Sequence, residues 1–443
     1  MIQQNILEAI SIILKNKMIG KTFSEPSLIK KLPREVEQIF AVFLKNKKLN
    51  GDEIRLVGGC VRDMLLGFEA KDFDFATKFL PQETIEILAE NNIHAIPTGV
   101  KFGTITAIIN HKHFEITTLR KDNEHDGRHC EPEFIDDYFS DASRRDFTMN
   151  ALYLDNRGVV HDYFDGISDL KASKVRFIGD AAQRIEEDFL RILRFFRFSC
   201  RYALELDDKG LQACITNKSG IKSLSSDRIR NEIFKTFIAA ENKKIIWIFE
   251  ALENCGVMAQ IFSAKLQIFN LQKLLKIEED FKIKLSTHIK FAALVFDNNI
   301  DLEEILLRLN FSNHEKAYFR FLIKNYQTTP ALDYQALRSL LVFEEKDFVR
   351  DAYLLNLSQN FFTEFQTKVG IEEKTESKVK LEIEAKNLLK IIDDFSMPNF
   401  PINGDDFIAR GILGKDIGKA LLQAKKRWIE SDFKLKREDL LKS

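Results

Sequence analysis

The chain has 443 residues, of which 45% are hydrophobic and 30% are charged, a balance that is typical of a folded globular protein. A formal net charge of −1 does not suggest a nucleic-acid partner, so any such site must come from local clusters of basic residues. The length predicts about two to four domains. No apolar run approaches the ~20 residues that a membrane span requires. Five scattered cysteines without a CxxC pair predict a reduced, cytoplasmic protein without structural zinc.

Residues 1–50 predict one or two helices whose sequence carries no recognisable chemistry. The opening segment is amphipathic and lacks the pattern of a signal or transit peptide, which also favours a cytoplasmic location. The strand-rich signals begin directly after this segment.

A glycine pair opens the first stretch that predicts chemistry, which runs from Arg55 to Thr77. It reads as a short apolar strand at 54–57, a turn at Gly58 and Gly59, a helix at about 61–66, a turn, and a second strand. The glycines let the backbone approach a ligand, and they open a helix whose N-terminus favours anions.

Two aspartates lie two residues apart in the predicted second strand. Asp72 and Asp74 therefore share one face, while Phe73 and Phe75 share the other. Paired carboxylates suit Mg²⁺ when phosphate oxygens complete its coordination shell. Taken singly, a glycine pair is ordinarily a packing turn, and two aspartates at this spacing ordinarily belong to a solvated edge strand. Within one strand–helix–strand unit they predict metal-assisted phosphoryl or nucleotidyl transfer.

The string GGCVRDMLLG followed by DFDFAT resembles the first motif of the class II CCA-adding tRNA nucleotidyltransferases and of the related bacterial poly(A) polymerases. Both families belong to the polymerase-β-like nucleotidyltransferase superfamily. The resemblance implies that Gly58, Gly59 and Arg62 contact a triphosphate, and that Asp72 and Asp74 are catalytic and bind two Mg²⁺ ions.

Residues 95–109 predict a loop followed by a strand, and residues 113–120 predict another strand. In the second one, Phe114 and Ile116 point to one side, while Glu115 points to the other. Glu115 is a candidate third carboxylate that deprotonates or orients an attacking hydroxyl, or completes a metal shell. A solvated strand glutamate fits the pattern equally well, but the resemblance implies an acid at this point and favours the catalytic role.

A charged segment at 121–141 lacks periodicity and predicts a loop. The resemblance implies that a flexible loop here switches addition from C to A, and that enzymes adding only CC lack it. The residues from Asp126 to His129 therefore favour the complete activity.

The string RRDFTMNAL, from Arg144 to Leu152, resembles the second motif of the family and predicts the start of a helix that Asp146 or Thr148 caps. The resemblance implies that Arg145 and Asp146 contact the ribose hydroxyls and phosphates of a nucleotide, and that Asn150 belongs to the same site. The chain turns helical from about residue 156. Residues 162–179 resemble the third motif, which connects head and neck.

The string EDFLRILRFFR predicts a helix on which Asp188, Arg191 and Arg194 follow at three-residue intervals. An ion-paired amphipathic helix is the ordinary interpretation. However, a carboxylate accepts and a guanidinium donates hydrogen bonds. Cytosine and adenine each present an amino donor beside a ring-nitrogen acceptor, whereas uracil and guanine reverse that order. One Asp with one Arg can therefore accept C and A and refuse U and G.

The fourth motif of the family is E-D-x-x-R. It implies that Asp188 and Arg191 read the base and that Glu187 orients Arg191, with Arg194 and Arg197 supporting phosphate or base. Residues 226–237 resemble the fifth motif and predict a structural buttress. The chain from about 240 to 390 is helical, and its segment 291–299 lacks the His-Asp pair of HD phosphohydrolases.

The last fifty residues form a tail in which residues 419–443 carry eight Lys or Arg and four Asp or Glu, a net charge of +4. This segment, with Trp428, could hold an RNA phosphate backbone. A solvated basic helix is an equally good interpretation.

These observations predict an α+β fold, with a polymerase-β-like nucleotidyltransferase head built on a mixed sheet and an all-α neck, body and tail. The predicted parts are an N-terminal helical extension, a nucleotidyltransferase head, a nucleotide-selecting neck, a helical body and a basic tRNA-binding tail, at residues 1–50, 51–155, 156–238, 239–390 and 391–443. The resemblance implies template-free addition of C, C and A to tRNA 3′ ends from CTP and ATP, with Mg²⁺.

A bacterial poly(A) polymerase is the second enzyme that the first motif fits. That branch carries an arginine-rich GRRFRL-type string before the second motif, whereas residues 98–120 do not, which favours CCA addition. An enzyme that adds only CC or only A, and an RNA-binding protein with an inactive head, also fit parts of the pattern. The sequence leaves the oligomeric state undecided.

Overall fold

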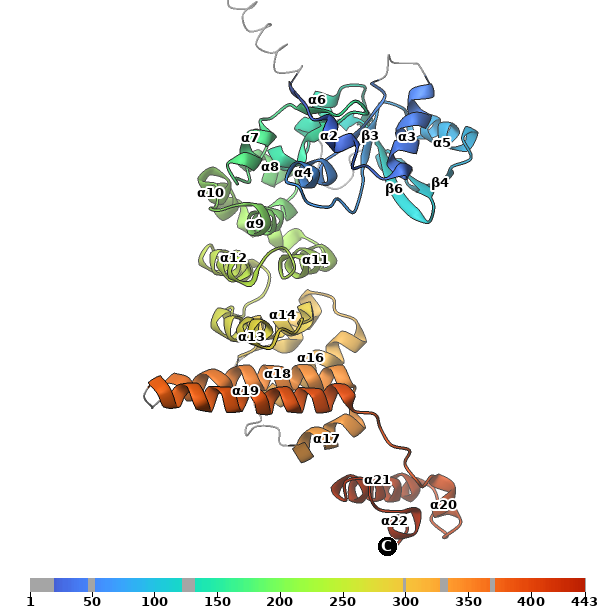
Figure 1. The fold of residues 1–443 in the computed structure, drawn as a ribbon, viewed down its shortest axis with the longest axis vertical. Coiled ribbons are helices and arrows are strands. Elements are labelled where there is room, and N and C mark those ends of the chain that lie inside the picture. The colour runs from blue at the N-terminus through green and yellow to red at the C-terminus, as the bar shows by residue number, and fades with distance from the viewer. Residues whose placement is uncertain are drawn as a thin grey trace, which may run out of the picture. The chain divides into compact units, whose positions relative to one another are not determined.

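The computed structural model describes residues 20–46, 52–121, 132–297, 300–326, 334–366 and 371–442. The chain divides into two compact units, residues 1–261 and 262–443. Unit 1 contains a mixed sheet with helices, and the secondary structure of the described part of unit 2 is helical (Figure 1). The predicted α+β class with helical parts after the head is confirmed. The proposed loop residues Asp126 to His129 lie outside the described residues.

The sheet of unit 1 has eight strands among the described residues, in the order β1-β10-β9-β2-β3-β6-β5-β4. Neighbouring strands are antiparallel except β3 and β6, which are parallel. The strands are β1 (Lys21–Ser24), β2 (Ile54–Val57), β3 (Phe75–Thr77), β4 (His94–Gly99), β5 (Thr104–Ile109), β6 (Lys112–Thr118), β9 (Leu152–Leu154) and β10 (Val159–Asp162). A separate ribbon pairs β7 (Arg120–Lys121) with β8 (Glu133–Phe134).

Three predictions about these elements need correction. The extension is not helical throughout, because β1 precedes the helices α2 (Pro26–Ile29) and α3 (Arg34–Lys45). The predicted loop at 95 is the strand β4, joined to β5 by the 3₁₀ turn η1 (Val100–Phe102). The chain does not turn helical at 156, because β10 pairs with β1 and β9. All four side chains of β1 are exposed, so its sequence shows no alternation of buried and exposed residues. The strand therefore depends on its pairing with a segment that is distant in the sequence.

The strand, turn and helix predicted around the glycine pair are confirmed. All four residues of β2 are buried. The chain then turns at Gly58, whose φ of +78° favours glycine, into the helix α4 (Gly59–Leu65). α3 and α5 (Pro81–Glu90) pack beside the strands that follow (Figure 1). The ring of Phe40 on α3 contacts that of Phe75, with 5.4 Å between centroids, and burying such a ring stabilises the fold by about 1.5–3 kcal/mol.

The remaining helices of unit 1 follow the second motif or lie directly before it. They are α6 (Tyr138–Ser143), α7 (Gly166–Lys171), α8 (Ala181–Glu187), α9 (Leu190–Tyr202), α10 (Asp208–Asn217), α11 (Ser226–Thr236) and α12 (Asn242–Asn254), with the 3₁₀ turns η2 (Thr148–Asn150), η3 (Lys218–Ser223) and η4 (Met258–Gln260). Aromatic rings join the second motif to α9, because Phe177 lies 4.9 Å from Phe147 and 5.5 Å from Phe195, centroid to centroid.

Unit 2 consists of helices joined by short connections where the chain is described. They are α13 (Ile268–Phe281), α14 (Thr287–Val295), α15 (Leu302–Arg308), α16 (Asn313–Tyr326), α17 (Tyr334–Phe343), α18 (Lys346–Gln366), α19 (Ile371–Asp394), α20 (Gly404–Ile408), α21 (Lys415–Glu430) and α22 (Arg437–Leu440). None of the helices in the described ranges is both long enough and apolar enough to cross a membrane.

Trp428 of the tail is 2% exposed and forms the centre of a small hydrophobic core. Its ring lies 5.0 Å from that of Phe400 and 4.8 Å from that of Phe433. The suggestion that Trp428 helps the basic segment to hold an RNA phosphate backbone is therefore wrong, because a buried indole cannot reach the backbone.

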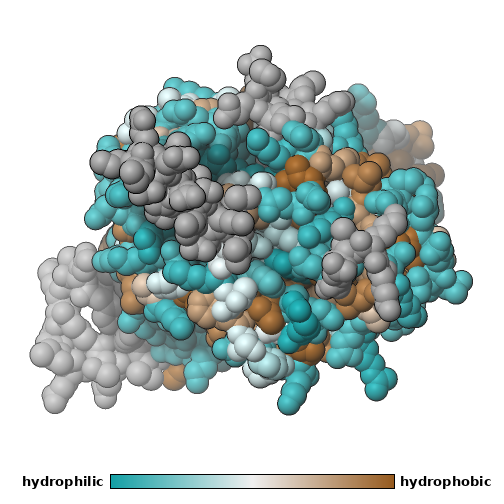
Figure 2. Space-filling model, turned by 90° about the horizontal axis from the view of Figure 1, so that it is seen from above, coloured by the Kyte–Doolittle hydropathy of each residue, from teal (hydrophilic) through white to brown (hydrophobic). Residues whose placement is uncertain are grey.

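The surface seen in Figure 2 is mainly hydrophilic, with small separate hydrophobic patches.

Candidate active site

The glycine turn after β2 is held in place by the second motif. The Gly58 amide donates to the carbonyl of Leu152 on β9 (3.0 Å). Arg62, one turn into α4, is buried and donates to Oδ1 of Asn150 (2.5 Å), while its guanidinium lies 4.4 Å from the centre of the Tyr202 ring. The predicted triphosphate-binding residues of the first motif and Asn150 of the second therefore form one contiguous group.

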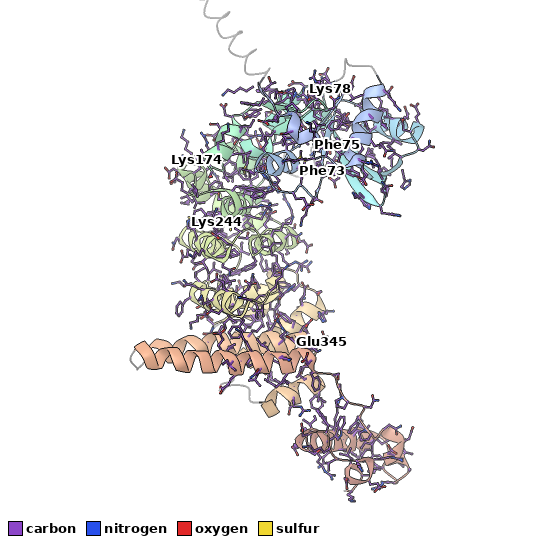
Figure 3. The ribbon with its side chains drawn as sticks, in the orientation of Figure 1. Phe73, Phe75, Lys78, Lys174, Lys244 and Glu345 are labelled. Atoms are coloured by element: carbon purple, nitrogen blue, oxygen red, sulfur yellow. The ribbon has the colours of Figure 1, made fainter. Side chains whose placement is uncertain are left out.

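Asp72 and Asp74 lie just before β3, which begins at Phe75, and not within a strand as predicted. The alternation still holds, because Phe73 and Phe75 are 8% and 0% exposed, whereas both aspartates are exposed. The two phenylalanines are labelled in Figure 3. The Val57 amide donates to the Asp74 carbonyl (2.9 Å) and keeps this segment extended beside β2. Both carboxylates consequently lie on the same side, as the sequence predicts.

Glu115 lies next to the aspartate pair. The parallel register of β3 and β6 pairs Phe75 with Ile116 and so sets Asp74 beside Glu115. The pKa of Asp74 is raised to about 6, first because the walls of the cleft partly desolvate its carboxyl, although this group keeps access to solvent. The negative charges of Glu115 and Asp72 raise this pKa further, and Arg145 lowers it. Three negative charges thus gather where a cation would relieve their repulsion.

Among the described residues, no group of three or more His, Cys, Asp or Glu side chains is arranged to hold a metal ion alone. Asp72 and Asp74 therefore fit an ion that takes its other ligands from water and substrate oxygens. That is the ordinary arrangement for Mg²⁺ at phosphate-transfer sites.

The second motif follows a helix and does not begin one, so the predicted caps are wrong. Asp137 caps α6, accepting from the Ser140 amide (2.8 Å). Asp146 instead accepts from the side-chain amide of Asn150 (3.0 Å) and from Nε of Arg194 (2.8 Å). Asp146 thus links the motif to α9.

Asp141, which the sequence pattern did not single out, fixes the orientation of Arg145. Its carboxylate, 1% exposed, accepts from Arg145 Nη2 (3.1 Å), from Arg144 Nη2 (2.7 Å) and from the Tyr153 hydroxyl (2.7 Å). Burial alone would raise the pKa of Asp141, but the two guanidinium groups and the Tyr153 hydroxyl lower it to about 2. The signal in the sequence was the spacing, because Asp141 lies three residues before Arg144 and four residues before Arg145, and residues at this spacing are neighbours on a helix.

The predicted helix across the fourth motif is broken at its second residue. Glu187 ends α8, Asp188 is extended, and α9 begins at Leu190, whose amide donates to Asp188 Oδ1 (3.1 Å). This local hydrogen bond stabilises the break. Asp188 is therefore not part of a helical stripe with Arg191.

Arg191 is held by three acceptors from two segments. It donates to Oε2 of Glu187 (2.5 Å), to the carbonyl of Arg184 (2.7 Å) and to the carbonyl of Arg144 (3.0 Å). The contact between Glu187 and Arg191 is thus present, and these bonds connect the fourth motif to the second.

The next two arginines of α9 differ in their shortest ion pairs. Arg194 pairs with Asp146 (2.6 Å) and, at 4.0 Å, with Glu232 on α11, whereas Arg197 pairs with Glu232 at 2.5 Å. Of these two, Arg194 lines the cavity that the motifs share and Arg197 does not, so the ligand role of Arg197 stays a prediction.

Arg228 on α11 is a second residue that the sequence pattern did not single out. Its Nη2 donates to Oδ2 of Asp188 (2.7 Å) across 40 residues of sequence. The fifth motif predicts a structural role only, and nothing in its helical pattern separates Arg228 from its neighbour Arg230.

One cavity of about 440 Å³ brings these motifs together, and this volume is within the usual range for small-ligand sites. Its side chains include six arginines and three aspartates, a balance that favours an anion. Its lining residues are Val57, Gly58, Gly59, Arg62, Asp74, Arg144, Arg145, Asp146, Asn150, Asp188, Leu190, Arg191, Arg194, Phe198 and Arg228.

A second cavity of about 380 Å³ shares Gly59, Arg62 and Asp74 with the first and also includes Asp72 and Arg201. Glu115 and Glu187 line neither cavity. Asp74 therefore borders both cavities, whereas Asp72 borders only the second.

Residues 54–176 match the family described as the Poly A polymerase head domain. The chain is 33% identical to the mouse protein named CCA tRNA nucleotidyltransferase 1, mitochondrial, over 97% of this chain and 94% of the mouse protein. It is 28% identical to a protein named CCA-adding enzyme from Lactococcus lactis subsp. cremoris, over 92% and 95% of the two chains.

Two solved structures share the fold. The Bacillus stearothermophilus CCA-adding enzyme in complex with CTP gives a TM-score of 0.68 at 20% identity, covering 90% of this chain and 94% of that one. The Thermotoga maritima CCA-adding enzyme complexed with tRNA gives 0.65 at 19% identity, covering 95% and 97%. Together with the sequence matches along nearly the whole length, these findings show that the chain belongs to the family of CCA-adding tRNA nucleotidyltransferases.

Proposed function

We propose that this protein adds C, C and A to the 3′ ends of tRNA, using CTP and ATP and no nucleic-acid template. The observation that carries the proposal is the single cavity in which Asp188 and Arg191 open onto the same space as Asp74. In such a cavity, the base of a nucleotide can be selected at one end while its phosphate reacts at the other. Relatives named for this activity, and structures of such relatives with CTP, ATP or tRNA, support it.

The nucleotide would be bound by residues from three motifs. The backbone at Gly58 and Gly59 begins α4, where a helix N-terminus and the nearby guanidinium of Arg62 favour the triphosphate. Arg145 and Asp146 of the second motif would contact the ribose and phosphates. Because Asp141 and Arg194 already hold these two side chains, little conformational entropy is lost on binding.

Base choice would follow from the hydrogen-bonding capacity that Asp188 and Arg191 retain after their contacts within the protein are made. A guanidinium has five N–H donors, and the three bonds of Arg191 described above leave donors for a ring nitrogen. An Asp188 carboxylate has about four acceptor sites, and its bonds from Leu190 and Arg228 leave sites for an exocyclic amino group. Uracil and guanine present the opposite order and would leave these groups unpaired.

Nucleotidyltransferases of this kind generally use divalent metal ions, and Asp72 and Asp74 would hold Mg²⁺ here. When bound, the cation neutralises phosphate charge and lowers the pKa of the acceptor hydroxyl. Glu115, set beside Asp74 by the β3–β6 register, would orient that hydroxyl and accept its proton. Arg62 and Arg145 would offset the charge of the departing pyrophosphate. The hydroxyl oxygen then bonds to the α-phosphorus as the bond to the pyrophosphate oxygen breaks.

Incubating the protein with Mg²⁺, a tRNA that lacks its CCA end and each nucleoside triphosphate separately tests the proposal. Incorporation of C, then of A, followed by termination supports it. Long A tails would identify a poly(A) polymerase. Addition of C alone or of A alone would identify a partial enzyme, and the absence of product would identify an RNA-binding protein.

The domain boundaries predicted from the sequence and the tRNA-binding role of the tail stay proposals. A cytoplasmic location also stays a proposal, since a relative is named mitochondrial.

A further inference from the structure

The strands beyond Glu115 present a continuous face. Side chains that lie opposite one another in the ladder point to the same side, so the register of β4, β5 and β6 defines rows across the three strands. The face, called the open face here, comprises His94, Ile108 and His113 in one row, Ile96, Thr106 and Glu115 in the next, and Thr104 with Thr117 in the third, where the β4 partner is Gly99. Thr98 lies at the register shift between Ile96 and Gly99 and belongs to the same face, because its hydroxyl bonds to that of Thr106.

The two sides of these strands differ in accessibility. On the covered side, Ile105 and Ile116 are fully buried, and α5 packs against all three strands (Figure 1). On the open face, His94, Thr98, His113 and Glu115 are exposed and Thr117 is half-buried, whereas Thr106 at the centre is buried. A strand segment with one buried and one solvated side has a surface that remains available to a ligand.

The open face has the chemistry of a nucleoside site more than that of a phosphate site. It contains two imidazoles, four hydroxyls, two isoleucines and one carboxylate, and no Lys or Arg. Thr98 and Thr106 hydroxyls lie 2.8 Å apart, and those of Thr104 and Thr117 lie 3.0 Å apart. The Thr104–Thr117 pair uses one of its two O–H donors in the mutual bond, so the second remains to meet a ribose hydroxyl or a base edge. In the other pair Thr106 is buried, and Thr98 is the exposed member. Imidazoles stack on bases.

The open face also lies on the correct side of the reacting atoms. β3 is between β2 and β6 in the sheet, so Asp74 separates the glycine turn that ends β2 from Glu115 on β6. In phosphoryl transfer the attacking and leaving oxygens are roughly in line. If the triphosphate extends over the glycine turn, the attacking hydroxyl arrives from the side of β6.

We propose that the open face of β4, β5 and β6 seats the 3′-terminal nucleoside of the acceptor RNA, with His113 and Thr117 as its positioning residues on either side of Glu115. This inference rests on the proposed function and names the acceptor half of that site. Neither residue lines the nucleotide cavity, so both should act on the acceptor without acting on the incoming nucleotide.

The test compares His113→Ala combined with Thr117→Val against wild type, using a tRNA that ends in CC, with ATP and Mg²⁺. The apparent KM for this tRNA should rise about tenfold, while the KM for ATP should stay within about twofold. The matched control is Lys112→Ala with Thr84→Val. Lys112 pairs with Glu35 away from the open face, and the buried Thr84 hydroxyl on α5 has no hydrogen-bond partner within the described ranges.

An unchanged KM for tRNA, or an equal rise in the KM for ATP, would overturn the inference. A second readout does not require turnover: a tRNA whose terminal nucleoside carries a photoreactive 4-thio base should crosslink to residues 94–117, and a crosslink found only elsewhere would also overturn it. A wild-type protein that crosslinks at this face yet incorporates no nucleotide would contradict the proposed function instead.

Discussion

The proposed catalytic part of the site and its proposed base-selecting part are built in different ways. Around Asp74, one continuous segment supplies strand, glycine turn, helix and carboxylate pair, and a single register adds Glu115. Around Asp188, the contacts come from far apart in the sequence, because Arg228 is 40 residues away and Arg144 is 47 residues from Arg191. If the proposed roles are correct, local segments carry the reaction, whereas base choice depends on how distant helices pack.

This comparison predicts that changes near Asp74 affect every nucleotide alike, whereas changes near Asp188 affect nucleotides unequally. Four variants test that difference.

The largest effect should come from Asp72→Ala. Removing one of two cation ligands should lower incorporation of both CMP and AMP by at least about 10³-fold, because the metal contributes several kcal/mol to transition-state stabilisation. Rates from single-turnover assays, alongside tRNA binding by filter retention, measure this. Binding should be retained, and Glu69→Ala, in the same second cavity, serves as the control. A parallel loss of tRNA binding would contradict the proposed metal role.

Asp141→Asn should destabilise the head and slow all additions together. It leaves Arg144 and Arg145 without their buried partner, at a cost of about 3–5 kcal/mol. Since the pKa of Asp141 is lowered to about 2, the carboxylate stabilises the fold above about pH 4, and that stabilisation is lost as the pH falls through about 2. Denaturant unfolding should show a gap between wild type and variant that is constant near neutral pH and shrinks below pH 4. A gap independent of pH would argue against the charge pair.

Asp188→Ala should relax base choice more than it weakens triphosphate binding. Losing the acceptor should reduce discrimination against UTP by about 10²-fold, as expected when a wrong base no longer leaves a buried group unpaired. Relative kcat/KM values for CTP, ATP and UTP measure this. A variant that still refuses UTP would eliminate the protein-template idea.

Arg228→Ala should have the smallest effect of the four variants and, like Asp188→Ala, should weaken base discrimination. The Arg228–Asp188 pair is partly exposed, so its loss should change base discrimination only about two- to fivefold, with Arg228→Lys closer to wild type. Arg230→Ala on the same helix is the matched control, because Arg230 pairs with Asp227. An equal slowing of CTP and ATP addition without altered discrimination would indicate a purely structural role.

Local patterns in the sequence were sufficient to predict the local structure of the segment at 54–77 that contains Asp72 and Asp74. A mainly apolar segment at 54–57, two glycines and the alternation of Asp and Phe at 72–75 predicted the strand, the turn and the shared side of the carboxylates, because each depends on backbone geometry within a few residues. The alternation in residues 113–120 likewise predicted the outward side of Glu115. The resemblance to the fourth motif predicted the contact between Glu187 and Arg191.

Tertiary structure alone decided the rest, because the deciding contacts join residues that no short pattern connects. Strands β1 and β10 form by pairing with each other across the unit. The pairing of Asp188 with Arg228 depends on how α11 packs on α9. Trp428, expected at the surface of a basic helix, is buried because Phe400 and Phe433 close over it. A sequence pattern reports which side of a segment is buried, but the partner that buries it is set by the packing of the whole chain.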